Sequence, residues 1–465
     1  MRLISTLRFI IAVILGKAMV YIARLFPSGG TSLPGYIALT VDPFCLSRLA
    51  CGFERIIVVT GTNGKTTTSN LIAALCQEQG WQVINNHEGA NMAAGVVTAL
   101  LRAPLKKGRR YLAVLEIDEG SLKRILSQIK ADLLVLTNLF RDQLDRYCEL
   151  QRLAAAIRSA LALQPQCHLL LNADDPLVAS LGSSRDKVLY YGMARVADSR
   201  QESGEVHEGK ICPFCSTPLN FKYYHYSHLG DYSCGRCAFK RPRPDYLAQN
   251  LAGWNGGQHF ELRFPGGSVT LETPLRGLYN IYNLVAASSA ALASGVRPEI
   301  IAGVVARFQP GQGRTEVFHL GERLCTLLLV KNPAGLTQAV KAVVDERQAQ
   351  AFILAINDLA ADGRDVSWIW DAELTPLAGS NIKRLICSGL RAGDMALCLK
   401  YNGLPKEKIG VVPDKKESLQ ALLATDAEGL YILCTYTNLA PYRKLLQKWE
   451  KQSEAAHLPS LSRPA

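Results

Sequence analysis

The sequence lacks an uninterrupted apolar segment that would cross a membrane. Its most apolar stretch, residues 8–26, is broken by Lys17 and carries Arg24 near its end, and no small-residue cleavage site follows. A spanning helix needs about 20 predominantly apolar residues, and a signal peptide needs a cleavage site. We therefore expect an amphipathic helix packed on the first domain, with a helix on the membrane surface, a peripheral membrane contact, as the alternative. The expected location is the cytoplasm, including the inner face of the cell membrane.

The sequence has fewer acidic than basic residues. The chain has 40 Asp and Glu against 52 Lys and Arg, a net charge of +12. This surplus favours acidic partners such as nucleotides, anionic substrates, membrane surfaces or nucleic acid, and a basic surface kept for solubility explains it equally well. A charged fraction of 20% beside 48% hydrophobic residues is the composition of a folded α/β protein and excludes a disordered chain.

A disulfide framework is also missing. The 13 cysteines are an odd number, and most of them, such as Cys76, Cys325 and Cys434, sit inside apolar runs where free cysteine behaves as a small buried hydrophobe. A secreted disulfide scaffold does not fit this pattern.

Four cysteines depart from it. They form CxxC-x18-CxxC, the spacing of a four-thiolate zinc ribbon, in which Zn²⁺ has no open position and its role is structural. The predicted zinc ligands are Cys212, Cys215, Cys234 and Cys237.

The length of 465 residues predicts two or three domains. From Arg55 onward short β-branched runs alternate with helical patterns, which predicts a parallel sheet covered on both faces. A hairpin is expected around Pro265-Gly266-Gly267, and a helix over 279–294. The predicted domains are an N-terminal helical segment (1–50), a central domain (51–307) with the ribbon inserted at 198–245, a smaller C-terminal α/β domain (312–450) and a tail (451–465).

A glycine-rich loop follows the first buried strand, residues 56–60, and opens a helix. Its backbone N–H groups and the helix N-terminus face one point, where a polyphosphate would sit. Lys65 would contact the β- and γ-phosphates as a catalytic residue, and the Thr66 hydroxyl would bind Mg²⁺. Strict Walker spacing fails, because Val59 stands where the first glycine is expected. The predicted ATP-binding loop is Gly61, Thr62, Asn63, Gly64, Lys65, Thr66 and Thr67.

The run TGTNGKTTT, residues 60–68, resembles the phosphate loop of the Mur ligases and folylpolyglutamate synthetases, and the resemblance extends over most of the chain. It implies an α/β Mur-ligase-type central domain that binds ATP and Mg²⁺. Glu116, in LEIDEG, matches the family's acidic Mg²⁺ ligand, and residues 86–91 resemble the loop after the second strand. Asn280 and Asn283 match side chains that pair with an adenine edge, and Arg314 matches an arginine that reaches the nucleotide phosphates.

Two positions depart from the family. Gln143 replaces the histidine of the TN…DHLD motif, and Ile157 stands, in our register, where many Mur ligases carry a carbamylated lysine. These departures imply that the usual second metal site is altered or absent.

The ribbon and the segment Ala361–Asp371 together resemble one branch of the family. Members of this branch lack an amino-acid site there and receive ammonia from a GatD-like glutaminase in a heterodimer. The resemblance implies a ligase of peptidoglycan synthesis, and so of cell-wall biogenesis and cell shape. It would convert the D-glutamate α-carboxylate of the lipid II stem peptide to D-isoglutamine through an acyl phosphate.

An aspartate of this segment would orient the catalytic histidine of the partner, as the third group does in other triads. Asp365 is the first candidate, followed by Asp371 and Asp362; each could instead cap a turn around Gly363. We find no Cys–His pair in this chain placed for glutamine hydrolysis, which favours a separate glutaminase.

Two rival functions remain. One is a conventional amino-acid-adding ligase of the Mur or folylpolyglutamate type that acts alone, against which the ribbon, Gln143 and Ile157 argue. The other is a nucleic-acid-binding ATPase, for which the Asn280, Asn283 and Arg314 matches would be coincidences, so no nucleic-acid partner is expected. The sequence leaves open whether the acceptor is lipid II or a soluble precursor.

Overall fold

The structure is a computed structural model that describes residues 2–23, 32–86, 90–104, 110–141, 150–202, 209–254, 257–309, 311 and 315–457. The chain divides into two compact units. The described residues up to Phe140 and from Leu150 to Gly311 form the first, and those from Thr315 onward belong to the second. Both units are mixed α/β, which confirms the predicted fold class.

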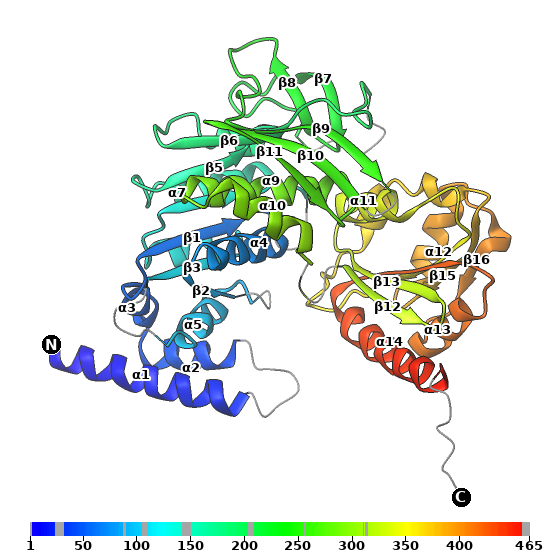
Figure 1. Cartoon of the computed structure of the whole chain (residues 1–465), viewed down its shortest axis with the longest axis horizontal. Helices are drawn as coiled ribbons and strands as arrows, with labels where there is room; N and C mark the ends of the chain where they lie inside the picture. The colour runs from blue at the N-terminus through cyan, green and yellow to red at the C-terminus, as the bar shows by residue number, and fades with distance from the viewer. Residues whose placement is uncertain are drawn as a thin grey trace, which may run out of the picture. The chain divides into compact units, whose positions relative to one another are not determined.

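The first unit is built on one nine-stranded sheet (Figure 1). Seven strands run parallel, as the alternation of strands and helices predicts, and an antiparallel hairpin extends one edge. The order across the sheet is β11 (Gly267–Thr273), β10 (Gly257–Phe264), β9 (Tyr246–Trp254), β6 (Val188–Met193), β5 (His168–Asn172), β4 (Leu133–Leu136), β1 (Arg55–Thr60), β3 (Tyr111–Glu116) and β2 (Gln82–Asn85).

The expected hairpin at Pro265–Gly267 is confirmed as β10 and β11. Gly266, at φ +101°, takes the left-handed turn conformation. Strand β9, however, begins at Tyr246, whereas we expected sheet signals to resume only at 257. Its sequence, YLAQNLAGW, carries polar residues and a glycine, so propensity is weak; pairing to β6 and β10 on both sides holds it.

Helices surround this sheet. Because β1 is followed directly by α4, the helix starts at the carboxyl end of the strand, where open α/β sheets bind ligands. α4 and α9 pack side by side against the sheet (Figure 1). The helices are α4 (Lys65–Glu78), α5 (Ala93–Leu101), α6 (Leu122–Leu126), α7 (Leu150–Leu161), α8 (Pro176–Ser180), α9 (Leu278–Ala293) and α10 (Pro298–Arg307).

Three helices precede β1: α1 (Arg2–Ala23), α2 (Leu33–Val41) and α3 (Cys45–Ala50). As expected, α1 packs on the first unit, where it contacts α2, α3 and α5. By length and composition alone, its segment Ile4–Ala23 would also suffice to cross a membrane. We did not expect this from the sequence, because Lys17 interrupts the apolar run.

The ribbon is inserted between β6 and β9, neighbouring strands of the same sheet. It contains a separate hairpin of β7 (Leu219–Tyr226) and β8 (Leu229–Cys234). An apolar cluster, which includes Tyr232 of β8 and Ala179 of α8, joins it to the central domain.

The buried carboxylate of Asp174, just after β5, ties this module to the domain. Asp174 accepts hydrogen bonds from Arg241 Nε at 2.5 Å, from Tyr282 Oη of α9 at 2.6 Å and from the Met193 amide at 2.8 Å. Its carbonyl oxygen also accepts from the Gly230 amide of β8 at 2.9 Å. One side chain thus joins β6, the ribbon and α9.

The second unit has a six-stranded sheet, parallel except for one edge strand. Its order is β12 (Thr315–Leu320), β13 (Arg323–Leu329), β17 (Gly429–Cys434), β14 (Gln350–Ala355), β15 (Ile382–Ser388) and β16 (Ile409–Val411). The helices are α11 (Pro333–Val343), α12 (Ala392–Tyr401), α13 (Lys415–Leu423), α14 (Tyr436–His457) and the short 3₁₀ turns η1 (Ser367–Asp371), η2 (Thr375–Ala378) and η3 (Lys406–Lys408).

The last helix corrects one expectation. α14 runs to His457, so seven residues that we assigned to a tail (451–465) are helical. These residues, KQSEAAH, include the strong helix formers Lys, Gln, Glu and Ala, and the next proline is Pro459.

Candidate functional site

The phosphate loop connects β1 to α4, and two of its glycines have backbone conformations that other residues rarely adopt. Gly61 has φ +122° and Gly64 has φ +83°. A Cβ atom on Gly61 would overlap Thr137 Oγ1, and one on Gly64 would overlap Asn283 Oδ1. Glycine is therefore required at both positions by conformation and by space.

The segment Thr137–Phe140, which follows β4, holds this loop in place. The Thr62 amide donates to the Asn138 carbonyl at 2.8 Å, and the Asn63 amide donates to Asn138 Oδ1 at 2.9 Å. Thr137 Oγ1 donates to the Asn63 carbonyl at 2.7 Å. The N-terminus of an α-helix presents backbone amides to an anion, and α4 begins at Lys65 within the loop. These hydrogen bonds fix the loop against the segment that follows β4.

Lys65 is buried beside an acidic partner. Its Nζ donates to the carbonyl oxygens of Gly61 at 2.5 Å and Thr62 at 3.2 Å, and it lies 3.1 Å from Glu119 Oε2. Both charged side chains are less than a tenth exposed. Sequence reasoning missed Glu119, although it stands three residues after Glu116 in the same LEIDEG motif. Glu119 thus neutralises the charge of the buried Lys65, which the phosphates of a nucleotide would otherwise neutralise.

Glu116, at the end of β3, is almost fully buried. Its Oε1 accepts a hydrogen bond from Asn91 Nδ2 at 3.1 Å, and Oε2 accepts none from the described residues. A buried carboxylate oxygen without a donor is costly unless a cation satisfies it. This observation fits the predicted Mg²⁺ ligand role, which Thr66 at the start of α4 would share.

The two asparagines of α9 differ in their surroundings. Asn283 lies against Gly64 of the phosphate loop, whereas Asn280 Nδ2 donates to the Arg276 carbonyl at 2.8 Å. Both are buried. The structure therefore places Asn283 at the loop and gives Asn280 a contact with the backbone before its own helix.

The remaining positions that match or depart from the family give no further evidence about the site. Arg314 and Gln143 lie outside the described residues, as do residues 87–89 of the loop after β2. Ile157 is in α7 with its side chain fully buried in the core. The predicted effect of Gln143 and Ile157 on a second metal stays a prediction.

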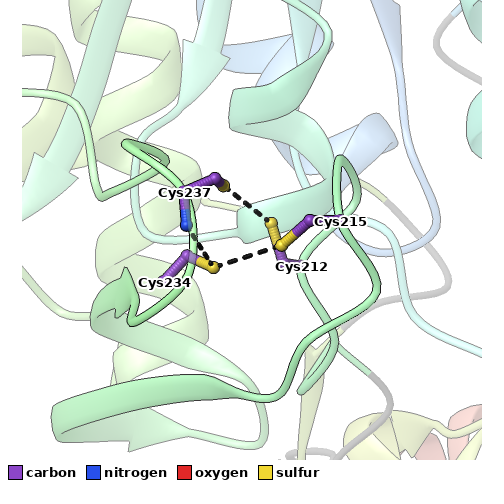
Figure 2. A group of neighbouring side chains, drawn as sticks. All are labelled: Cys212, Cys215, Cys234 and Cys237. Carbon is purple, nitrogen blue, oxygen red and sulfur yellow. Dashed lines mark hydrogen bonds between the residues drawn. The ribbon is translucent and has the colours of Figure 1, made fainter.

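The four cysteines of the ribbon converge on one point (Figure 2). Their sulfur atoms all lie within 4.8 Å of one another, with Cys212 Sγ 3.6 Å from Cys237 Sγ and Cys215 Sγ 3.4 Å from Cys234 Sγ. The amides of Arg236 and Cys237 both donate to Cys234 Sγ at 3.4 Å. Amide donors stabilise a thiolate, so the donor set fits a tetrahedral Zn²⁺.

The turn of the ribbon hairpin packs behind the phosphate loop. The Phe140 ring stacks on Tyr226 with centroids 5.9 Å apart and lies 4.9 Å from the His228 ring. The Phe140 amide and Thr62 Oγ1 form a hydrogen bond of 3.1 Å. Through these contacts the ribbon supports the segment that holds the loop.

The carboxylate of Asp175, the residue after Asp174, also contacts the segment that holds the phosphate loop. Asp175 Oδ2 accepts from the Leu139 amide at 2.8 Å and lies 3.4 Å from His228 Nε2. Its Oδ1 caps α8 through the amides of Leu177 and Val178. From the sequence we noted only that residues 169–176 end in a polar turn. The bonds of Asp174 and Asp175 to protein groups give these residues a structural role.

The three candidate aspartates of the second unit have different environments. Asp362 is buried and accepts bonds from the Thr437 amide at 2.7 Å and Thr437 Oγ1 at 2.5 Å, so it holds the start of α14. Asp365 is half-buried and accepts from the Ser367 amide at 2.8 Å through Oδ1. Asp371 ends η1 and is half-buried. Asp365 and Asp371 both keep part of the side chain exposed, and Asp371 forms an ion pair with Arg141.

Comparison with known proteins agrees with this architecture. Residues 59–234 match the model of the Mur ligase middle domain, and residues 329–439 match the MurT ligase C-terminal model. A relative from Streptococcus pneumoniae, named lipid II isoglutaminyl synthase (glutamine-hydrolyzing) subunit MurT, is 36% identical over 90% of this chain and 92% of its own.

Solved structures show the same fold. A pseudomurein peptide ligase type C from Methanothermus fervidus has a TM-score of 0.66 at 23% identity, covering 85% of this chain and 78% of its own. MurF ligase from Thermotoga maritima, in complex with ADP, has a TM-score of 0.63 at 13% identity, covering 90% and 85%.

The Lys65–Glu119 pair gives the first test. Replacing Lys65 with Met removes a charge-assisted contact to phosphate and should weaken ATP binding about 10- to 100-fold in isothermal titration calorimetry with Mg²⁺ present. It also leaves Glu119 buried without its partner, which lowers stability. The double variant Lys65→Met/Glu119→Gln removes that second effect. It should recover the melting temperature but not the affinity, and tight ATP binding by this variant would refute the role of Lys65.

The zinc cluster gives the second test. The purified chain should contain one zinc per molecule by plasma mass spectrometry, and Cys234→Ser should lose the metal and lower the melting temperature. Cys51→Ser, at an exposed cysteine outside the ribbon, is the matched control and should change neither. A stable, metal-free wild-type protein would contradict the zinc assignment.

Proposed function

The chain belongs to the family of MurT subunits of lipid II isoglutaminyl synthase, which are Mur ligases, and from this premise we propose that it amidates lipid II at the expense of ATP. It is a ligase that forms a C–N bond. The observation that carries the proposal is similarity to such a subunit over 90% of the chain, with a C-terminal region that matches the MurT ligase C-terminal model. The acceptor we propose is the D-glutamate α-carboxylate of the stem peptide, and the product is D-isoglutamine.

The first chemical step would activate the carboxylate, which is a poor electrophile. A carboxylate oxygen attacks the γ-phosphorus of ATP, the bond from that phosphorus to the β–γ bridging oxygen breaks, and ADP leaves. Lys65 and the first-turn amides of α4 lie where the phosphate charge would develop, and they stabilise it. A Mg²⁺ ion held by Glu116 and Thr66 would supply further charge neutralisation to the phosphates.

In the second step ammonia attacks the acyl carbon of the acyl phosphate. The C–O bond breaks, inorganic phosphate leaves, and the nitrogen loses one proton to give the amide. Free ammonia is scarce at neutral pH because ammonium dominates. Delivery from glutamine by a separate glutaminase subunit is therefore chemically sensible, and the relative's name makes it one subunit of a glutamine-hydrolyzing synthase.

We propose that this partner is a GatD-like glutaminase and that it docks on the second unit beside the loop that carries Asp365. Among the described residues, several large apolar side chains are exposed there. Trp370 of η1 lies with its ring 6.1 Å from that of Tyr401, which is 73% exposed. Leu390 and Leu397, before and along α12, extend the surface. Such a patch beside an accessible carboxylate is typical of a protein interface.

The location we propose is the cytoplasm. The zinc ribbon, with all four coordination positions filled by thiolates, is assigned a structural role and takes no part in the chemistry.

The central test is an amidation assay with the full chain and lipid II, with inorganic phosphate release measured and the product identified by mass spectrometry. With a co-expressed GatD-like glutaminase, glutamine should support amidation; without it, only high ammonium should do so. Lys65→Met should abolish both reactions. Efficient addition of an amino acid by the chain alone would instead establish a conventional ligase, and amidation confined to soluble precursors would reassign the acceptor.

Asp365 gives a separate test within the complex. Asp365→Asn should lower glutamine-dependent amidation about 100-fold or more, because a triad histidine without its carboxylate loses its orientation. Ammonium-dependent amidation should not change. Asp426→Asn, at a highly exposed aspartate of the same unit, is the matched control. Equal loss with both nitrogen donors would contradict the assignment, and selective loss in Asp371→Asn alone would move the role to that residue.

A further inference from the structure

Helix α1 has two faces of opposite environment. At 100° per residue, Ala12, Gly16, Val20 and Ala23 form one stripe, and all four are buried. The opposite face is apolar as well, yet exposed to solvent along the helix. Its large side chains are Ile4 (68% exposed), Leu7 (58%), Ile11 (41%), Ile14 (61%), Leu15 (43%) and Ile22 (45%).

This exposed face has basic edges. On the same helical projection Lys17 borders it on one side and Arg8 on the other, and both are exposed. No acidic residue occurs anywhere in α1. A helix face that exposes several large apolar side chains on a folded domain marks an interaction site, because exposed apolar area is otherwise unfavourable.

The helix cannot serve as a membrane span while its domain is folded. A Cβ atom on Gly16 would lie 2.6 Å from Leu101 Cδ1 of α5, so the backbone of α1 sits directly on that helix. Arg8 Nη2 donates to the Val41 carbonyl at 2.9 Å, and Arg48 Nη1 donates to the Ser5 carbonyl at 2.6 Å. One face is thus committed to the protein, and only the other is available to a partner.

The local charge indicates the chemistry of that partner. Residues 1–50 contain five basic side chains (Arg2, Arg8, Lys17, Arg24 and Arg48) and one acidic side chain, Asp42. Asp42 is buried and lies 3.2 Å from Arg48, so its charge is compensated. An apolar face set in a strongly basic segment complements a surface that is apolar inside and anionic at its rim. A bilayer of anionic phospholipids has this character.

We propose that the exposed face of α1 docks the protein on an anionic phospholipid bilayer, with the helix axis parallel to the membrane and its apolar side chains among the acyl chains. α2, which packs on α1, exposes the further large side chains Leu33 and Tyr36. The docking follows from the helix itself. Its use, to hold the site near a lipid-linked acceptor, rests on the proposed function.

Vesicle co-sedimentation of the full chain tests the proposal. Wild-type protein should sediment with vesicles of mixed phosphatidylcholine and phosphatidylglycerol, less with phosphatidylcholine alone, and less at high salt. Ile14→Glu should weaken binding about tenfold or more, since it places a charge in the inserted face. Lys17→Glu should weaken binding mainly to the anionic vesicles. Leu163→Glu, at a 44% exposed leucine after α7, is the matched control and should bind like wild type.

Three results would overturn the proposal. The first is absence of wild-type binding to the anionic vesicles at low salt, and the second is equal binding by Ile14→Glu and Leu163→Glu. The third is a light-scattering measurement in which wild type is a dimer and Ile14→Glu a monomer while vesicle binding is unchanged, which would assign the face to a second copy of the chain. Unchanged melting temperatures confirm that the variants are folded.

An activity comparison separates this proposal from the proposed function. Ile14→Glu should amidate detergent-solubilised lipid II as fast as wild type but be slower on lipid II embedded in anionic vesicles. Failure of wild type to amidate lipid II in detergent would refute the proposed function and leave the vesicle-binding result standing. Equal rates of both proteins on embedded lipid II would refute the use of the docking.

Discussion

Two adjacent buried carboxylates at the end of β5 organise the nucleotide-binding half of this protein. Asp174 takes donors from the ribbon, from the amide at the end of β6 and from Tyr282 of α9, the residue next to Asn283. Asp175 takes the Leu139 amide from the segment that holds the phosphate loop. Burying a carboxylate is costly unless its oxygens accept hydrogen bonds, so these two side chains favour the state in which all of these elements are in place together. The ribbon is thereby part of the framework of the ATP site.

This framework explains how the cysteine ribbon can matter in a ligase without contacting the substrate. The four cysteines fix one end of the β7–β8 hairpin, and its turn carries Tyr226 and His228 against Phe140. Phe140 in turn is bonded to Thr62 of the phosphate loop. The ribbon therefore supports the phosphate loop through packed aromatic rings and one short hydrogen-bonded segment, all within the first unit. The second unit carries the features we connect with nitrogen delivery.

Much of this arrangement was readable from local sequence. The phosphate loop, the cluster of four cysteines, the β10–β11 hairpin and the mixed α/β fold depend on residues close together in the chain, so patterns of spacing revealed them. Glu119, Asp174 and Asp175 were missed as partners because their roles depend on contacts such as Asp174 to Tyr282, which lie far apart in the sequence. Strand β9 was placed too late because its pairing overrides a weak propensity. Of the candidate aspartates, only the structure separated Asp362, bonded to Thr437, from Asp365.

The charges around Lys65 imply an order of events at the ATP site. Glu119 neutralises Lys65, and Glu116 lies at the end of the same strand segment with one unsatisfied oxygen. Two carboxylates beside a phosphate loop would repel a triphosphate if it arrived alone, because Coulomb repulsion between buried charges is poorly screened. Glu116 would hold a divalent cation there, which would offset that repulsion, and Lys65 would then be able to contact the nucleotide. Glu116 and Glu119, which lie beside the phosphate loop, would therefore favour a metal–nucleotide complex over the metal-free triphosphate.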